Sequence, residues 1–285
     1  MKNVLITGSS GGMGLAVCRL FLEKGYRVFG LDLFPTNEIN GGGFTFIQTD
    51  LTDYDSVKNA YEKVSGETEK LDAILHFSGK YDLNSLIEIS EKDFTDIFDV
   101  NLFGVYRVNK IFFPLLNVSS GNAVSFGSAP SGGRAPSGGR IIITSSELAP
   151  LDPLPFTGLY GITKSALEKY AFSLRMELNL LGVKVSVIRP GAVNSKMIPK
   201  SVSRIRDFNE NTKIYKTNAG RFLKVTEAVE SRMIPPEKIA ALALKAVESK
   251  RPRLVYSKNR NPLLLLLNSL PDRMQNFIIK QILRS

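Results

Sequence analysis

A tyrosine and a lysine stand four positions apart, as Tyr160 and Lys164, at the start of a long helical stretch. Residues i and i+4 share one face of a helix, so we expect the ammonium near the phenol. A free tyrosine has a pKa near ~10, and a nearby ammonium lowers that pKa by stabilising the phenolate. The pair is therefore a candidate acid/base. Such pairs also occur incidentally at helix starts, so the neighbouring residues must decide.

Hydroxyl and amide side chains precede that pair in the sequence. Ser145 and Ser146 follow an apolar stretch, residues 141–143, that predicts a buried strand. A serine at the carboxyl edge of a parallel sheet can hydrogen-bond a substrate oxygen as it gains or loses its proton. Asn101 falls inside another helical stretch beside the small Gly104. This arrangement suggests a local helix distortion that holds a water near the lysine.

The segment TGSSGGMG, from Thr7 to Gly14, lies directly between a predicted strand and a predicted helix. Gly8 permits a tight turn, Gly12 lets the backbone approach a pyrophosphate, and Gly14 allows the helix to pack closely on the strand. The helix N-terminus then presents its N–H groups and positive dipole end to phosphate. A plain glycine-rich turn is the alternative, and the position between strand and helix favours a dinucleotide site.

Two aspartates follow strand ends. Asp32 lies 18 residues beyond Gly14, where a carboxylate accepts hydrogen bonds from both adenosine ribose hydroxyls and repels a 2′-phosphate. Leu33 comes next, and the glycine-rich segment holds no Arg or Lys, so the sequence predicts NAD rather than NADP. A strand-end aspartate without a ligand is the alternative. Asp50 is placed either to reach the adenine or to cap the helix that starts near Asp53.

The hydrophobic pattern supplies a scaffold that can position these residues. Predicted strands cover residues 2–6, 27–32, 44–48, 71–77, 140–145, 183–189 and 253–256, and predicted helices cover residues 12–24, 53–65, 91–116, 160–181 and 236–248. This alternation predicts a doubly wound parallel sheet, a three-layer α/β/α Rossmann fold forming a single domain over residues 1–256.

Two segments interrupt the alternation. Residues 119–139 are rich in Gly and Ser and hold most of a tandem APSGGR repeat, which predicts a flexible insertion. Residues 195–233 mix polar and apolar side chains without a clear period, which predicts an irregular substrate loop after the sixth strand.

Together these motifs resemble those of the short-chain dehydrogenase/reductase family, in the branch whose glycine motif reads TGxxxGxG. The resemblance covers roughly residues 2–256 and includes the glycine segment, Asp50, Asn101, Ser146, Tyr160, Lys164 and the turn Arg189-Pro190-Gly191. It implies an NAD-dependent oxidoreductase that transfers a hydride between nicotinamide and a secondary alcohol or ketone.

The resemblance also implies roles for individual residues. Tyr160 would be the acid/base, and Lys164 would lower its pKa and contact the ribose. Ser146 would bind the substrate oxygen, and Asn101 would hold a proton-relay water. No metal site is expected. The implied cofactor contacts are Gly8, Ser10, Gly12, Met13, Gly14, Asp32, Asp50, Leu51, Gly79, Tyr160, Lys164, Pro190, Val193 and Ser195.

Besides the Gly/Ser-rich insertion at residues 119–139, the sequence departs from the family pattern in two places. The usual Asn-Asn-Ala-Gly after the fourth strand reads HFSG at residues 76–79, so an amide that braces the sheet is missing. His76, the only histidine, reads as a structural residue at a strand end. The spacing from Ser146 to Tyr160 is one residue longer than usual, which keeps Ser145 as the alternative serine.

Apolar segments indicate a lipophilic substrate. Residues 148–156, between the serine and the tyrosine, would form an apolar pocket wall. Residues 257–285 form a C-terminal extension that ends in a basic amphipathic helix, with Met274, Phe277, Ile278, Ile282, Arg273, Lys280 and Arg284 at helical spacing. That helix would contact an anionic membrane surface, cover a hydrophobic entrance, or pack on the domain or a partner subunit. The arrangement is similar to steroid and retinol dehydrogenase-like members.

Composition limits the remaining possibilities. The net charge of +10 is concentrated in residues 250–285, which hold eight basic residues and one acid, so we expect no nucleic-acid groove. The single cysteine excludes an internal disulfide, and no segment approaches the ~20 apolar residues that span a bilayer. The chain starts without a signal-peptide core. We expect a cytoplasmic homodimer or homotetramer, peripheral at a membrane if the C-terminal helix binds one.

Two other functions fit parts of the sequence. A non-catalytic NAD-binding sensor or scaffold needs the glycine segment alone, and the presence of Ser146, Tyr160 and Lys164 counts against it. An epimerase or dehydratase of nucleotide sugars usually carries a TGxxGxxG spacing and a longer substrate domain, which this sequence lacks.

Overall fold

Seven parallel strands form one sheet in a computed structural model that describes residues 1–39, 41–116, 138–152, 154–194, 197–230 and 233–284. Their order is β3-β2-β1-β4-β5-β6-β7. The strands are β1 Asn3–Thr7, β2 Arg27–Asp32, β3 Phe44–Gln48, β4 Ala73–His76, β5 Arg140–Thr144, β6 Lys184–Pro190 and β7 Val255–Lys258. The order reverses between β1 and β4, and ligands bind beyond the carboxyl ends of strands at such a point.

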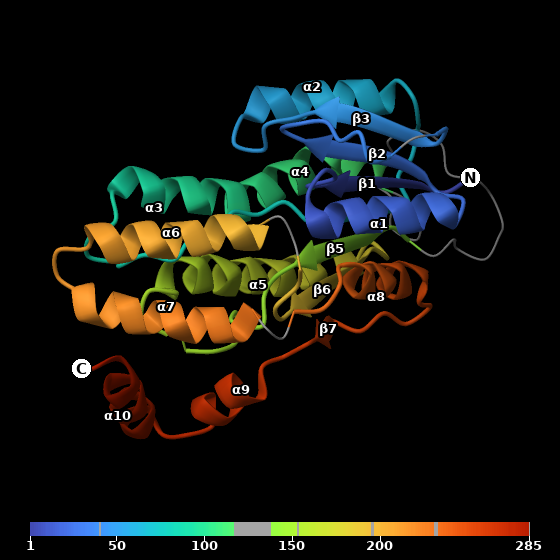
Figure 1. Cartoon of the computed structure of the whole chain (residues 1–285). Coiled ribbons are helices and arrows are strands. Elements are labelled where there is room, and N and C mark those ends of the chain that lie inside the picture. The colour runs from blue at the N-terminus through green and yellow to red at the C-terminus, as the bar shows by residue number, and fades with distance from the viewer. Residues whose placement is uncertain (40, 117–137, 153, 195–196, 231–232, 285) are drawn as a thin grey trace.

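Helices cover both faces of the sheet, as Figure 1 shows. One face carries α1 (Gly12–Glu23) and α8 (Glu237–Glu248), which pack side by side around the fully buried Phe21. The other face carries α2 (Tyr54–Ser65), α4 (Gly104–Phe112) and α5 (Gly158–Asn179). The predicted three-layer, doubly wound Rossmann fold is confirmed.

The stretch predicted as one helix over residues 91–116 is divided in the structure. It begins as α3 (Glu91–Phe98), passes through a π-helical turn at Asp99–Phe103, continues as α4, and ends in a 3₁₀ turn at Phe113–Leu115. The distortion expected beside Asn101 is this π-helical turn.

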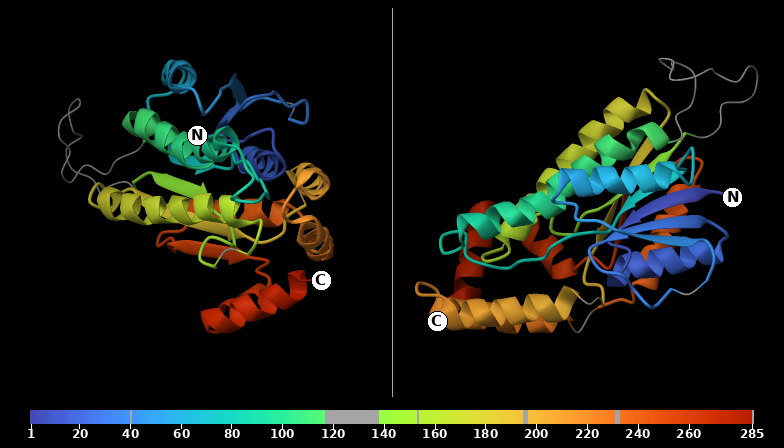
Figure 2. Two further views of the ribbon diagram at one scale, coloured as in Figure 1. Left: turned by 90° about the vertical axis from the view of Figure 1, so that its left-hand side faces the viewer. Right: turned by 90° about the horizontal axis from the view of Figure 1, so that it is seen from above.

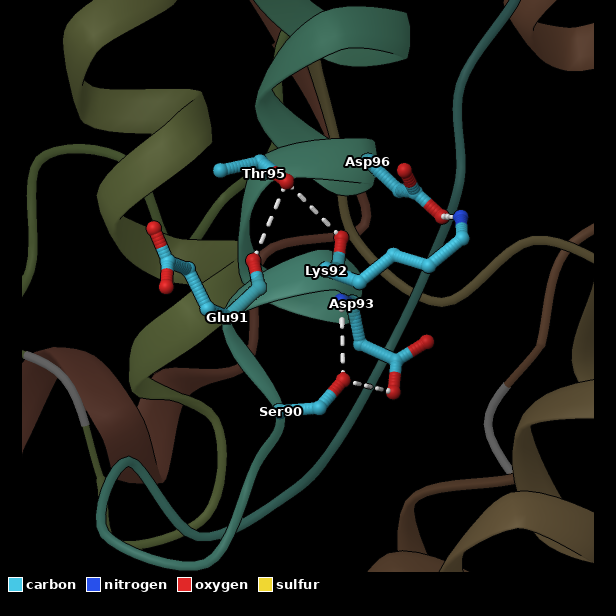
Figure 3. A network of polar contacts seen from close by, with 6 residues as sticks. All are labelled: Ser90, Glu91, Lys92, Asp93, Thr95 and Asp96. Atoms are coloured by element: carbon cyan, nitrogen blue, oxygen red, sulfur yellow. Dashed lines mark hydrogen bonds and ion pairs between the residues drawn. The ribbon is translucent and has the colours of Figure 1, made fainter.

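The start of α3 is fixed by local polar contacts, drawn in Figure 3. The Ser90 hydroxyl accepts a hydrogen bond from the Asp93 N–H at 3.1 Å and donates to the Asp93 carboxylate at 2.7 Å. Lys92 and Asp96, four residues apart, form an exposed ion pair at 2.6 Å. This N-cap satisfies a helix N–H that would otherwise lack a partner, so the helix leading to Asn101 begins at a defined residue.

The prediction of an irregular loop over residues 195–233 is wrong. The described part of this segment forms two helices, α6 (Met197–Asn211) and α7 (Lys216–Glu230), which pack on each other. Figures 1 and 2 show this pair beyond the carboxyl ends of the strands, near the outer ends of α3 and α5. A small apolar cluster joins the pair to the loop before α5 and to the C-terminal helix; its buried members are Leu83, Phe156, Ile205, Phe208, Ala219, Phe222 and Leu283.

Two helices follow the last strand, α9 (Pro262–Asn268) and α10 (Asp272–Leu283), and α10 packs against α7. The predicted C-terminal amphipathic helix is confirmed as a helix. Within the described residues, no helix is both long and apolar enough to cross a membrane. Most of the predicted Gly/Ser-rich insertion, residues 117–137, lies outside the described residues.

Candidate active site

The first turns of α5 bring Tyr160 and Lys164 to the end of β5. The Lys164 ammonium lies 5.6 Å from the centre of the Tyr160 ring and donates a hydrogen bond to the Thr144 carbonyl at 3.0 Å. Ser146 is a hydrogen-bond partner of the Tyr160 hydroxyl. The i and i+4 spacing therefore brings the phenol and the ammonium together on α5, and the end of β5 adds the Ser146 hydroxyl to the group.

Burial changes the protonation of this pair. It raises the pKa of Tyr160 to about 12, and the hydrogen bond from Ser146 acts in the opposite direction. It also lowers the pKa of Lys164 to about 8, against the attraction of the Glu168 carboxylate. The pKa of Tyr160 is therefore raised by burial, contrary to the lowering expected from the nearby lysine, because burial disfavours each charged form. A neutral phenol at pH 7 is a proton donor, which is the state that ketone reduction requires.

The two neighbouring serines have different surroundings. Ser146 faces Tyr160, and its oxygen accepts a hydrogen bond from the Leu148 N–H at 3.2 Å. The Ser145 hydroxyl points instead to the Lys164 carbonyl, 3.4 Å away, and is almost fully buried. The geometry therefore favours Ser146 over Ser145 as the group that meets a substrate oxygen beside the tyrosine.

Asn101 links the π-helical turn to the start of α5. Its Oδ1 accepts a hydrogen bond from the Lys80 N–H at 2.7 Å, and its Nδ2 donates to the Lys80 carbonyl at 2.9 Å and to the Thr163 hydroxyl at 3.1 Å. Thr163 in turn donates to the Tyr160 carbonyl at 2.8 Å. Both amide hydrogens of Asn101 are thereby used inside the protein, so its side chain fixes the backbone around the tyrosine.

The glycine-rich turn has the shape that a pyrophosphate needs. Gly8 has a φ of +71°, and a Cβ there would lie 2.6 Å from the Ser78 nitrogen. A Cβ on Gly14 would lie 2.0 Å from the Gly8 carbonyl oxygen, so only glycine lets α1 begin against the turn. No side chain caps this helix end and no acid stands in its first turn. The positive end of the helix is therefore open to an anion.

Asp32 is held over the same turn. One carboxylate oxygen accepts a hydrogen bond from the Ser10 N–H at 2.9 Å, and the other accepts from the Leu33 N–H at 2.8 Å. Two backbone donors thus orient this carboxylate beside the glycine-rich segment. Together, the glycine turn, the uncapped helix end and the fixed acceptor fit an adenine dinucleotide.

The other expected cofactor contacts are distributed around the crevice. Met13, Gly79, Pro190 and Val193 line the cavity described below, whereas Ser195 lies outside the described residues. Asp50 accepts hydrogen bonds from the Thr52 N–H at 2.8 Å and the Thr52 hydroxyl at 2.7 Å. Its alternative as a helix cap is wrong, since Asp53 caps α2 by accepting from the Asp55 N–H. Leu51 packs beside the π-helical turn, against Gly104.

His76 is a structural residue, as expected from its place at the end of β4. Its Nε2 lies 2.8 Å from the Asn109 amide oxygen, and Asn109 donates to the Tyr170 hydroxyl at 3.1 Å. Burial lowers the pKa of His76 to about 4, so the ring is neutral at physiological pH. This buried chain braces β4 against α4 and α5.

A cavity of about 830 Å³ opens from the catalytic group toward the C-terminal helices. Tyr160, Ser146 and Lys164 are among its polar lining residues. The predicted apolar wall before α5 contributes Leu148, Leu154 and Pro155. A larger apolar share comes from α9, α10 and the turn between them: Leu263, Leu264, Leu266, Leu267, Leu270, Ile278, Ile279, Ile282 and Leu283. The cavity suits an apolar molecule with a polar group near Tyr160.

A family model described as short chain dehydrogenase matches residues 2–205 of the chain. The chain belongs to the short chain dehydrogenase family. It is accordingly an oxidoreductase acting on CH–OH groups, and the family implies a nicotinamide cofactor. This match favours a dehydrogenase or reductase over the nucleotide-sugar epimerase alternative.

Two curated relatives align with this short chain dehydrogenase over nearly its whole length. A 3-ketodihydrosphingosine reductase of Bacteroides thetaiotaomicron is 26% identical over 283 residues, covering 97% of this chain and 96% of the relative. An NADPH-dependent 3-dehydrocapnine reductase of Ornithobacterium rhinotracheale is 27% identical, covering 96% and 94%. An NADPH-dependent 1-acyldihydroxyacetone phosphate reductase of Schizosaccharomyces pombe is 29% identical but covers only 72% of this chain and 64% of its own.

Solved structures agree on the fold. A short chain dehydrogenase family protein from Francisella tularensis superposes with a TM-score of 0.70 at 21% identity, covering 90% of this chain and 96% of that one. A short-chain dehydrogenase from Streptomyces avermitilis gives a TM-score of 0.70 at 17% identity and covers 99% of this chain.

Two residues of this short chain dehydrogenase's site are absent from the sequence-based prediction. The Tyr81 ring meets the Tyr160 ring edge to face, with centroids 4.5 Å apart. Glu147 is the only acid among the described residues that line the cavity, and it is 7% exposed. In the sequence, the position of Glu147 directly after Ser146 is the feature that could have indicated its place in the site.

Proposed function

We propose that this short chain dehydrogenase interconverts a ketone and a secondary alcohol on a lipophilic substrate, with NAD as the hydride carrier and Tyr160 as the acid/base. The observation that supports the proposal most is that the Tyr160 and Ser146 hydroxyls, which are hydrogen-bond partners, line a cavity whose wall is mostly apolar. A ketone oxygen placed there meets two hydroxyls while the rest of the molecule occupies the leucine-rich part.

In this proposal the chain's own residues handle the proton. Ser146 holds the substrate oxygen, and Tyr160 supplies its proton during reduction or accepts it during oxidation. Lys164 places a positive charge beside the phenol, which favours the phenolate after the proton has left. Asn101, through Thr163, holds the tyrosine backbone in place. The bound nicotinamide would supply or accept the hydride.

The choice of NAD over NADP rests on Asp32. Its carboxylate is fixed by two backbone N–H groups and would repel a 2′-phosphate on the ribose. Two of the relatives bear names that specify NADPH, so the coenzyme preference must be measured directly.

The lipophilic substrate is supported by the cavity and by the relatives that align over the full chain. Their named substrates, 3-ketodihydrosphingosine and 3-dehydrocapnine, make a long-chain ketone the first compound to test. Steroid and retinoid ketones or aldehydes, which the sequence pattern suggests, are the second group.

The proposal is tested by following oxidation of NADH and NADPH by the purified full chain with 3-ketodihydrosphingosine, a steroid ketone and retinal. We expect NADH-dependent turnover with at least one lipophilic compound. Tyr160→Phe should lower kcat by about 10²–10⁴-fold and leave NADH binding, measured by fluorescence, within a few-fold of the wild type. Retained turnover in Tyr160→Phe would exclude the assigned role. Tight NADH binding without turnover on any compound would favour the sensor or scaffold function instead.

A further inference from the structure

Helices α9 and α10 expose five large apolar side chains within twenty residues of sequence. Leu263 is 63% exposed, Leu266 62%, Met274 50%, Phe277 62% and Ile282 51%. We call these residues, with Arg273, Lys280 and Arg284, the α9–α10 face. Soluble proteins rarely leave a contiguous apolar patch uncovered unless something binds there.

The basic residues of α10 lie along one edge of its apolar stripe. At about 100° per residue, Arg273 and Lys280 fall within roughly 20° of each other, and Arg284 follows at the end of the helix. Phe277 and Met274 come next around the helix. The buried Gln275 and Leu283 lie on either side of Ile279, which is roughly opposite Phe277. The exposed half of α10 thus combines apolar and basic side chains.

Neighbouring segments add to this positive charge. Lys224 on α7 is exposed and lines the cavity, and Arg221 donates a hydrogen bond to the Arg284 carbonyl. Asp272 is the only acid in residues 250–285. The C-terminal extension that contains α10 therefore carries a net positive charge.

The same face borders the cavity. Leu263, Leu266 and Ile282 line the cavity and are each more than half exposed, so solvent reaches the side of the cavity that α9 and α10 form. This solvent-accessible side is the candidate mouth of the cavity.

We propose that the α9–α10 face binds the surface of an anionic lipid bilayer, with the cavity mouth turned toward the lipid. Apolar side chains flanked by Lys and Arg on one side of a helix are the features of a helix that lies in the bilayer interface. A second copy of the chain would present the same positive charge to this face and be repelled. The inference rests on the proposed function in one respect only, that a lipophilic substrate would enter the cavity from the bilayer.

Vesicle sedimentation tests the proposal with the full chain. With vesicles of phosphatidylcholine containing 30% phosphatidylglycerol, most of the protein should appear in the pellet. With pure phosphatidylcholine vesicles, a much smaller fraction of the protein should sediment. Binding should weaken as salt is raised, because part of the attraction is electrostatic. The triple variant Arg273→Gln, Lys280→Gln, Arg284→Gln should bind anionic vesicles about a hundred-fold more weakly, given the contribution of each basic residue near an anionic surface. Phe277→Gln should also weaken binding.

A matched control removes the same charge elsewhere. Lys58, Lys63 and Lys70 are exposed at the opposite end of the molecule, on or just after α2, and changing all three to Gln should leave vesicle binding unchanged. Equal loss in both triple variants, or no binding of the wild type to anionic vesicles, would overturn the proposal. Light scattering provides a further test. If the wild type is a dimer and Phe277→Gln is a monomer, a second copy of the chain covers the α9–α10 face, and the proposal is wrong. Turnover of a short, water-soluble ketone without vesicles should be unchanged in both triple variants, which separates failure of this inference from failure of the proposed function.

Discussion

The Glu147 carboxylate accepts a hydrogen bond at 2.5 Å from the main-chain N–H of Asn261, which lies 114 residues later in the sequence. Glu147 directly follows Ser146, and Asn261 caps α9 by accepting from the Leu263 N–H. The contact therefore connects the loop that carries the serine to the first helix of the leucine-rich wall. Burial raises the pKa of Glu147, and the hydrogen bond from Asn261 acts against that rise.

Removing this acceptor should loosen the cavity wall without touching the reacting atoms. Glu147→Ala is expected to raise KM for a long-chain ketone about ten-fold, with kcat changed less than three-fold, since uniform binding is lost. Glu147→Gln keeps an acceptor oxygen and should remain close to the wild type. An equal loss with a short ketone would show instead that Glu147 acts on the catalytic group.

Mutation can distinguish the roles of Ser145 and Ser146. Ser146→Ala should lower kcat by about 10²–10³-fold, the cost of losing one donor to a developing oxyanion. Ser145→Ala should cost much less, because the Ser145 hydroxyl faces the Lys164 carbonyl at 3.4 Å. Steady-state kinetics with one ketone at saturating cofactor measures both. The reverse order would reassign the substrate contact to Ser145.

Coenzyme preference should follow the charge at the end of β2. Replacing Asp32 with Ser and Leu33 with Arg removes the repulsive carboxylate and adds a partner for a 2′-phosphate. We expect the ratio of kcat/KM for NADPH to that for NADH to rise by about 10²-fold, from roughly two charge interactions. Asp53→Ser is a suitable control, because that carboxylate caps α2 away from the cleft. A wild-type enzyme that already prefers NADPH would contradict the assignment of Asp32.

Lys164 should make stability depend on pH at alkaline values. Its pKa is lowered to about 8 in the folded protein, whereas an unfolded lysine titrates near 10.5. At Lys164 the folded state therefore binds fewer protons between these values, and the contribution of Lys164 to the free energy of unfolding should rise as pH increases from 8 to 10.5. Each pKa unit corresponds to about 1.4 kcal/mol, so the full effect is roughly 3 kcal/mol.

Urea unfolding at several pH values, for the wild type and Lys164→Met, measures that effect. The methionine variant should lack the rise, because it has no group to titrate. A parallel pH dependence in both proteins would show that another group is responsible.

Much of the fold was readable from the sequence because its strands are buried on both faces. The stretches predicted as β2 and β3 match the structure residue for residue, and the stretch predicted as α1 differs by one. Buried parallel strands read as continuous apolar runs, and glycine marks the ends of helices such as α1. The segment that became α6 and α7 was missed because its helices bury few positions, such as Ile205, Phe208 and Phe222, and these pack in part against the distant Phe156.

The site was predictable in its residue types but not in its electrostatics. Spacing placed Tyr160 near Lys164, yet the direction of the tyrosine pKa in the protein without cofactor depends on burial, which the linear sequence does not show. The lining of the cavity was likewise hidden. The leucines after Pro262 were not predicted as a helix. Their place in the cavity wall near Ser146 depends on a fold that brings residues 114 positions apart into contact.

The π-helical turn at Asp99–Phe103 holds one residue more than an α-helical turn of the same kind. That residue sets the rotation of everything after it, including Asn109, the partner of the buried His76 ring. Removing one residue from the turn would rotate α4 by about 100° relative to α3. Asn109 would then leave His76, and Asn101 would lose its alignment with Lys80. Among variants of this segment, changes of length should therefore be far less tolerated than changes of side chain.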